Sequence, residues 1–268
     1  MSDTPAYLLA GQPAELERLQ LQSRVWEPAG RALLRQITPR PGLHALELGC
    51  GVMGWLRILS EWVGADGRVT GSDLDDAMLA HARALIAAES LANVSLVKDD
   101  LFASGLPPAA FDLVHARFQI APLGRAVEQL GVYAGLVKPG GWIVVEDPDI
   151  GSWHVNPDAP AVTQLIALID HGFRAGGGDF SAGRRLPEWM RAAGLDPLVE
   201  ATVVALPPGH PYLRLPLQFA TSLRSRLLPL AGESTLDDLL ARAEQELARP
   251  GTWGTTFTLI QARARVPG

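Results

Sequence analysis

Apolar residues recur at helical spacing near the start of the chain, which predicts an amphipathic helix over residues 13–26. Four positions define its spacing of three and four: Leu16, Leu19, Ser23 and Trp26. Pro28 suits the first turn of a second helix, expected over residues 29–37, because that turn leaves its backbone nitrogens without helical partners anyway. The turn at residues 39–42 is expected to end this helix.

From residue 43 onwards, short apolar runs alternate with segments of helical spacing. Strands are expected over residues 43–47, 68–72, 94–97, 111–115, 142–146, 198–206 and 255–264. Helices are expected over residues 55–63, 125–137, 159–174, 186–193, 215–228 and 236–248, and in a segment from Met78 to Ile86 that Asp75 or Asp76 can cap. The motif Lys138-Pro139-Gly140-Gly141 is expected to be a helix-stop turn. Strands that alternate with helices indicate an α/β fold with a parallel sheet and right-handed crossovers.

Acidic residues end three of these strands, beside a glycine-rich loop. Glu47 lies two residues before the loop Gly49-x-Gly51-x-x-Gly54, Asp73 ends the second strand, and Asp99 and Asp100 end the third. Ligands of an open α/β sheet bind beyond the carboxyl ends of its strands. A single acid there could merely cap a helix, but three in this arrangement predict a ligand site.

The glycine loop also matches the dinucleotide-binding fingerprint, and Asp73 follows Gly54 at the distance which that fingerprint expects. Glu47 decides against this interpretation. A dinucleotide places its pyrophosphate at the N-terminus of the following helix, where the Glu47 carboxylate would repel it. The same carboxylate suits a cationic ligand without phosphate, such as S-adenosylmethionine, which carries a sulfonium and an α-amino group.

The other strand-end acids can be assigned within the same hypothesis. Asp73 can accept hydrogen bonds from ribose hydroxyls, a role common to both cofactors. Asp100 can accept from the adenine 6-amino group, with Leu101 on one side of the ring and Leu74 or Met78 on the other. Such a pairing of polar acceptors with apolar walls is typical of small-molecule sites.

Composition narrows the class of protein. The chain has 268 residues, of which 47% are hydrophobic and 19% charged, and its formal net charge is −6. That charge disfavours duplex nucleic acid as a partner. Cys50 is the one cysteine, so no intrachain disulfide can form, and neither a signal peptide nor a membrane span is expected. We therefore expect a cytoplasmic protein with a small-molecule substrate, no nucleic acid and no membrane partner, and leave a homodimer open.

The stretch from Ala45 to Glu146 resembles the class I S-adenosylmethionine-dependent methyltransferases in all their usual motifs. These motifs are Leu46-Glu47-Leu48-Gly49-Cys50-Gly51, Val69-Thr70-Gly71-Ser72-Asp73, Asp100-Leu101, Phe111-Asp112-Leu113-Val114 and Leu136-Val137-Lys138-Pro139-Gly140-Gly141. The chain departs from many relatives at Met53, where they have glycine. The N-terminal residues around Tyr7, Glu15 and Gln22 look like the lid helix of a bacterial small-molecule subgroup.

The resemblance implies a Rossmann-like seven-stranded sheet in the order 3-2-1-4-5-7-6, with strand 7 antiparallel. It also implies a helical lid over residues 1–40 and a methyltransferase domain over residues 41–268, with cap insertions near 149–182 and 207–254. S-adenosylmethionine is the implied cofactor, and no metal is expected. The residues assigned to cofactor binding are Tyr7, Gln22, Glu47, Gly49, Gly51, Asp73, Leu74, Met78, Asp100, Leu101, Ala116 and Arg117.

Methyl transfer from a sulfonium is an in-line displacement, in which alignment of the acceptor is the main requirement. An oxygen acceptor must also lose a proton, for which His154, after the fifth strand, is the first candidate base. His115, His171, Asp147 and Asp149 are further candidates. Whether oxygen, nitrogen or carbon is methylated stays open.

The segments 149–182 and 207–254 carry aromatic residues that could line a pocket for a planar acceptor or form the core of a cap. These residues are Trp153, Phe173, Phe180, Tyr212, Phe219 and Trp253, and Trp189 lies between the two segments. Three rival functions remain open: a NAD-dependent oxidoreductase, a methyltransferase-like protein that uses S-adenosylmethionine for another reaction, and a nucleic-acid methyltransferase. Glu47 and Asp100 disfavour the first, and acidity disfavours the third.

Overall fold

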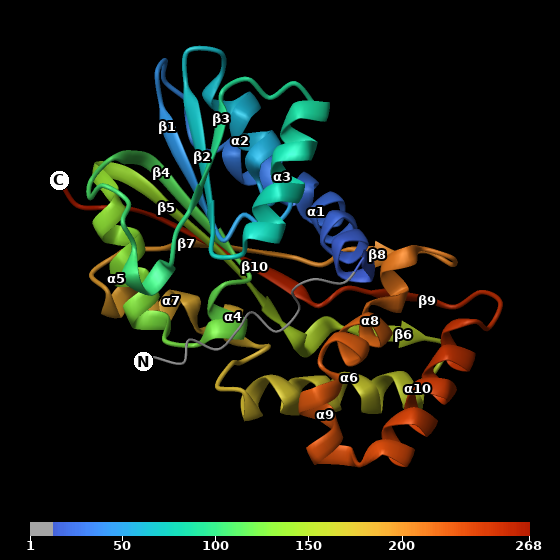
Figure 1. Ribbon diagram of the computed structural model, residues 1–268. Helices are drawn as coiled ribbons and strands as arrows, with labels where there is room; N and C mark the ends of the chain where they lie inside the picture. Colours follow the sequence, from blue (N-terminus) through green and yellow to red (C-terminus); the bar gives the residue numbers. More distant parts are fainter. Residues whose placement is uncertain (1–12) are drawn as a thin grey trace.

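A twisted sheet of seven strands forms the centre of the protein, as the computed structural model, which describes residues 13–268, shows (Figure 1). The strands lie in the order β3-β2-β1-β4-β5-β10-β7. Their bounds are β3 Val94–Lys98, β2 Arg68–Asp73, β1 His44–Leu48, β4 Phe111–Arg117, β5 Val137–Asp149, β10 Thr258–Arg265 and β7 Leu198–Thr202. All pairs from β3 to β5 are parallel, and β10 runs antiparallel to both of its neighbours. This confirms the predicted fold class and strand order.

Helices cover both faces of the sheet. On one face, α2 (Leu56–Val63) and α3 (Asp76–Ala88) share a buried apolar cluster with the C-terminal end of α1 (Pro13–Leu34). On the other face, α4 (Ile120–Leu123), α5 (Ala126–Leu136) and α7 (Leu186–Ala192) bury a second cluster. As predicted, Asp75 caps α3, accepting hydrogen bonds from the nitrogens of Ala77 and Met78.

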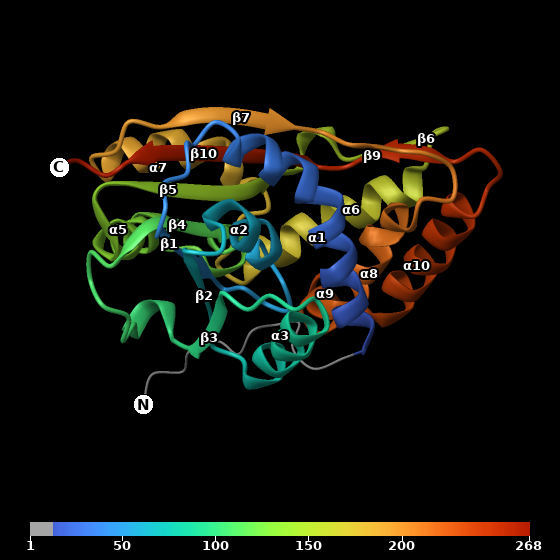
Figure 2. The same ribbon diagram turned by 90° about the horizontal axis from the view of Figure 1, so that it is seen from above.

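Four helices and a small sheet lie beside the main sheet, beyond the carboxyl end of β5 (Figure 2). The helices are α6 Pro160–Ala175, α8 Leu215–Ser222, α9 Arg224–Ala231 and α10 Glu233–Leu247. The small sheet has the order β6-β9-β8, with bounds β6 His154–Asn156, β9 Trp253–Thr255 and β8 Ala205–Leu206. We call these helices and strands, together with the short segments that lead into them, the cap.

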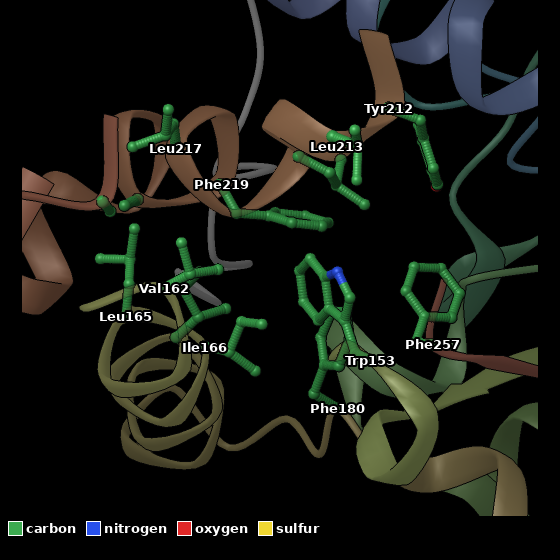
Figure 3. Packing of buried hydrophobic residues seen from close by; sticks show 14 of the residues in the cluster. Trp153, Val162, Leu165, Ile166, Phe180, Tyr212, Leu213, Leu217, Phe219 and Phe257 are labelled. Atoms are coloured by element: carbon green, nitrogen blue, oxygen red, sulfur yellow. The ribbon is translucent and has the colours of Figure 1, made fainter. Parts of the chain in front are cut away.

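The aromatic residues of the cap pack mostly on one another (Figure 3). Trp153, Phe173, Phe180, Tyr212 and Phe219 are buried in one cluster, and Trp153 stacks on Phe180 with ring centroids 5.5 Å apart. Trp253 of β9 is 44% exposed. Trp189 lies outside the cap, on α7, where it packs beneath the Arg185 guanidinium. The structure therefore supports the interpretation of these aromatic residues as the core of the cap.

The first two predicted helices are one. The prediction of a break at Pro28 was wrong, because α1 continues through it to Leu34. Proline costs a helix one hydrogen bond, but the residues on either side bury large apolar surfaces. Trp26 and Leu33 are both completely buried, and α1 contacts both α2 and α8. Tertiary packing thus outweighs the local preference of proline.

Three other boundaries differ from the predictions. The motif at residues 138–141 lies inside β5, where the pairing with β4 shifts register, and not in a separate turn. The strand predicted over 198–206 is divided between β7 and β8, in different sheets. The helix predicted over 215–228 is divided at Leu223, which separates α8 from α9. Periodicity alone does not reveal where a continuous apolar pattern changes its packing partner. Within the described part of the chain, no helix is both long and apolar enough to cross a membrane.

Candidate functional site

A pocket of about 370 Å³ opens at the carboxyl ends of β1 to β4. The ends of these strands, the start of α3, the loop into α4 and two residues of α1 line it. Its volume falls within the range of about 300–1,000 Å³ that is usual for small-molecule sites. The pocket therefore lies where an open α/β sheet is expected to bind its ligand.

The charge of the pocket is strongly asymmetric. Among the described residues, its lining includes five carboxylates and one guanidinium, that of Arg117. The carboxylates belong to Glu47, Asp73, Asp75, Asp99 and Asp100. Such a lining attracts a cationic ligand and opposes a pyrophosphate, because like charges in a partly desolvated cleft repel each other.

The glycine loop joins β1 to α2 in a conformation that requires glycine. Gly49, Gly51 and Gly54 have φ angles of 59°, 52° and 46°, in the left-handed region. Gly51 lines the pocket, and a Cβ at its position would meet nothing within 4 Å. At Gly54 a Cβ would instead lie 2.3 Å from the Glu47 Oε1 atom. The glycine that follows Met53 therefore leaves room for the Glu47 carboxylate.

Asp73 is held by backbone donors at the end of β2. Its Oδ2 atom accepts from the Gly51 nitrogen at 2.9 Å, and its Oδ1 atom accepts from the Asp75 nitrogen at 2.9 Å. Burial raises the pKa of Asp73 above its ordinary value, although these backbone donors act in the opposite direction. Each carboxylate oxygen keeps a further lone pair for a hydroxyl donor, as a ribose-binding role requires.

The third strand supplies the opposite wall. The Asp100 Oδ1 atom accepts from the Phe102 nitrogen at 2.9 Å and so caps the 3₁₀ turn Leu101–Ala103. Leu101, Leu74 and Met78 also line the pocket, and Leu74 is 47% exposed. An exposed leucine beside a cleft suits contact with a planar ring. The structure thus brings together the polar and apolar residues that the sequence placed around an adenine.

Glu47 takes part in a buried network of ionisable side chains. Its Oε1 atom accepts from the Trp55 nitrogen at 3.1 Å, and its Oε2 atom contacts the His115 Nδ1 atom. On the other side of the ring, the His115 Nε2 atom lies 3.2 Å from the Glu146 Oε2 atom. The Trp55 ring stacks on His115 with centroids 3.7 Å apart. Glu47 still lines the pocket, so this network reaches the ligand site at that residue.

The remaining residues assigned to cofactor binding are placed as follows. Gln22 lines the pocket from α1 and accepts a hydrogen bond of 2.8 Å from Arg18. Gly49 and Arg117 also line it, whereas Ala116 is buried beside it in β4 without lining it. Tyr7 lies outside the described residues.

None of the candidate bases lines the pocket. His154 lies on β6 with an exposed side chain, His171 is exposed on α6, and His115 is buried between two carboxylates. Asp149 forms an ion pair with Arg184. The catalytic role of His154 stays a prediction that the geometry of the pocket does not support. No cluster of potential metal ligands occurs among residues 13–268.

Asp147 is a buried carboxyl group outside the pocket. Its Oδ1 atom accepts from the Ala121 nitrogen at 2.9 Å, while its Oδ2 atom has no hydrogen-bond partner among the described residues. Burial raises the pKa of Asp147 to about 8. Asp147 therefore binds the backbone of α4 through Ala121. With this pKa its carboxyl group is mostly protonated at neutral pH.

Several residues of the pocket were not predicted from the sequence, among them Leu19, Phe102, Phe118, Gln119 and Leu123. Leu19 comes from α1, while Phe118, Gln119 and Leu123 follow β4. Gln119 packs closely on the glycine loop, because a Cβ at Gly49 would lie 2.2 Å from its Nε2 atom. The rule that ligands bind beyond strand ends could have indicated residues 118–119, since they directly follow a predicted strand.

Residues 45–141 match the family model described as a methyltransferase domain. The chain is 34% identical over 148 residues to aklanonic acid methyltransferase DauC of Streptomyces sp. (strain C5), covering 54% of this chain and 66% of that protein. It is 32% identical over 147 residues to nocamycin O-methyltransferase of Saccharothrix syringae, covering 53% and 52%. The match thus spans between half and two thirds of these relatives' length.

A solved structure shows the same fold at greater evolutionary distance. It is a SAM-dependent methyltransferase from Aquifex aeolicus, which superposes with a TM-score of 0.54 and 20% sequence identity. The superposition covers 72% of this chain and 92% of that one.

Proposed function

We propose that the chain, which matches a methyltransferase domain over residues 45–141, is a class I S-adenosylmethionine-dependent methyltransferase. It would bind S-adenosylmethionine in the pocket beyond β1 to β4 and transfer the methyl group to a small-molecule acceptor. The observation that carries the proposal is the set of three strand-end carboxylates, Glu47, Asp73 and Asp100, around one cleft. A NAD-dependent reaction is disfavoured, because the only guanidinium among the described lining residues faces five carboxylates.

The residues present fit the cofactor from one end to the other. Asp73, fixed by Gly51 and Asp75, would hold the ribose hydroxyls, and Asp100 would hold the adenine amino group. Gly51 leaves open space for close approach of the ligand to the backbone. The leucines and Met78 described above would flank the ring. Glu47, Gln22 and Arg117 would lie toward the amino-acid end.

When bound, S-adenosylmethionine supplies an activated methyl group on a positively charged sulfur. What the chain must contribute is orientation and exclusion of water. Phe118, Gln119 and Leu123 lie on the side of the pocket that leads from β4 into α4, and we place the acceptor against them. Their side chains are apolar or, in Gln119, a neutral amide, so they can orient a small molecule by packing and hydrogen bonding without a formal charge.

The acceptor class rests on the relatives. The two named above act, by their names, on aklanonic acid and on an oxygen of nocamycin, both small molecules. The formal net charge of −6 also opposes a nucleic-acid acceptor. We place the enzyme in the cytoplasm, where its cysteine, the buried Cys50, stays reduced.

We also propose that residues 1–40 act as a lid and that the cap borders the acceptor side. Leu19 and Gln22 support this, because α1 has no place in the sheet and yet both residues line the pocket. The domain limits 41–268, with insertions near 149–182 and 207–254, are part of the same proposal.

The test of methyl transfer is mass spectrometry of a small-molecule extract incubated with the protein and with S-adenosylmethionine labelled in its methyl group. Appearance of labelled product together with S-adenosylhomocysteine is expected. If a metabolite were converted to an unlabelled product and no S-adenosylmethionine were consumed, the chain would catalyse another reaction.

A further inference from the structure

Two carboxylates face the two ring nitrogens of one completely buried histidine. His115 contacts Glu47 through Nδ1 and Glu146 through Nε2. A neutral imidazole has one N–H group and can donate to only one of them, leaving the other carboxylate opposite a lone pair. An imidazolium donates to both. The geometry therefore favours a protonated ring between two ionised carboxylates.

Each carboxylate is also satisfied on its other oxygen. The Trp55 nitrogen donates to Glu47, and the Gln261 side chain donates to Glu146. Buried charges persist only when they are paired and hydrogen-bonded, and here both conditions hold. Burial alone would lower the pKa of His115, but Glu47 and Glu146 outweigh it and raise the pKa.

The network continues to a cation at the pocket. The Arg117 Nη1 atom lies 3.9 Å from the Glu146 Oε2 atom, and it has no hydrogen-bond partner within residues 13–268. The Arg117 side chain is only 6% exposed, yet it lines the same pocket as Glu47. The four side chains thus alternate in charge, from Glu47 through His115 and Glu146 to Arg117.

Both ends of this alternating row open on one cavity, one as an anion and the other as a cation. We propose that His115 is a positioning residue that, by contacting Glu47 and Glu146 with its two ring nitrogens, fixes both carboxylates so that the pocket recognises a zwitterionic amino-acid group. The α-ammonium group of the ligand then pairs with Glu47 and its α-carboxylate with Arg117. This inference rests on the proposed function, because S-adenosylmethionine carries such a group.

The test compares two ligands that differ in the amino-acid group. S-adenosylhomocysteine contains it, whereas 5′-methylthioadenosine keeps the adenosine and sulfur without it. Dissociation constants of both are measured by isothermal titration for the wild type and for His115→Gln, which removes the charge at similar size. The matched control is His44→Gln, since His44 lies on β1 outside the pocket, bonded to Thr70 at 2.9 Å.

His115→Gln should weaken S-adenosylhomocysteine binding about tenfold or more, because a charge-assisted interaction is lost. It should change 5′-methylthioadenosine affinity by less than about twofold, and His44→Gln should change neither. Equal weakening of both ligands, or of neither, would overturn the inference. If the wild type bound neither compound, the proposed function itself would fail, and the inference with it.

Glu146→Gln provides a second variant, which is needed should His115→Gln fail to fold. The substitution keeps the shape of the side chain and removes the negative charge that lies between His115 and Arg117. Both of these neighbours stay unchanged. A selective loss of S-adenosylhomocysteine affinity is again expected. Unchanged selectivity between the two ligands in a folded Glu146→Gln protein contradicts the proposed row of charges.

Discussion

The carboxylate of Asp73 shows how a single residue couples the backbone to the ligand. It accepts from the nitrogens of Gly51 and Asp75, so its position is set before any ligand binds. Preorganisation of this kind lowers the entropic cost of binding. The oxygens that remain available point to a ligand with vicinal hydroxyl groups.

Asp73→Asn should weaken S-adenosylhomocysteine binding by about 1–3 kcal/mol, because ribose hydroxyls lose a charged acceptor. The amide keeps nearly the same shape but only one acceptor oxygen, so one of the two backbone N–H groups loses its partner as well. Isothermal titration measures the loss. Asp112→Asn is the control, because the Asp112 carboxylate also accepts a hydrogen bond from a backbone nitrogen, that of His44, but lies outside this pocket. An unchanged dissociation constant in folded Asp73→Asn would refute the ribose assignment.

Asp147 makes the stability of the protein depend on pH. Its pKa is about 8 in the folded protein, against 3.8 as the ordinary value. Between these limits the folded state binds more protons than the unfolded chain, so the free energy of unfolding falls as pH rises. Asp147→Asn is uncharged throughout and should lose this dependence.

The variant should therefore gain about 1 kcal/mol or more relative to the wild type between about pH 5 and about pH 8, since one pKa unit corresponds to about 1.4 kcal/mol. Thermal unfolding of both proteins across this range measures the difference. Parallel curves of melting temperature against pH would show that Asp147 keeps an ordinary pKa.

At the scale of elements, the glycine loop is the segment in which conformation and site coincide. Gly54 combines a left-handed φ with a side-chain neighbour, the Glu47 carboxylate. Gly64, at the end of α2, also has a positive φ, 70°, but a Cβ there would meet nothing within 4 Å. A substitution at Gly64 therefore tests backbone strain alone, whereas one at Gly54 tests strain together with side-chain crowding.

Gly64→Ala should destabilise the protein by about 1 kcal/mol through strain alone. Gly54→Ala should destabilise it further and also weaken S-adenosylhomocysteine, because Glu47 must move away from the Trp55 nitrogen. Chemical denaturation and titration together check this. Equal effects of the two substitutions would show that Gly54 has no special relation to Glu47.

The helix α1 gives a prediction for the proposed lid. If α1 closes over the cofactor, trypsin should cleave at Arg18 and Arg24 more slowly when S-adenosylhomocysteine is bound, because ligation stabilises the packed helix. Cleavage at Arg265, near the C-terminal end of the sheet, serves as the internal reference. Equal rates with and without ligand would indicate that α1 is only a packing helix.

Much of the sheet could be predicted from the sequence, because buried parallel strands are short, apolar and bounded by turns. The sites at their ends followed from the same rule. The cap could not be predicted in detail. Its small sheet uses strands of two or three residues, too short to show a period, and α1 crosses Pro28 because distant side chains bury Trp26. His115 looked like a base near the cofactor, and only the fold shows the two glutamates around it.

On the scale of the whole molecule, the sheet and the cap have different roles. The sheet presents carboxylates from successive strands at one edge, where the acidic pocket lies. The cap has its own buried core, against which Phe118 of the pocket packs. We therefore propose that charge selects the ligand, so that this pocket accepts a cationic nucleoside and rejects an anionic dinucleotide.

Titration of the wild type and of Glu47→Gln with S-adenosylmethionine and with NAD tests that claim most directly. We expect the wild type to bind S-adenosylmethionine and the substitution to weaken this binding by about 1 kcal/mol or more, because an attractive charge is lost. We expect neither protein to bind NAD appreciably. Absence of S-adenosylmethionine binding by both forms, together with NAD binding that tightens in Glu47→Gln, would contradict the claim.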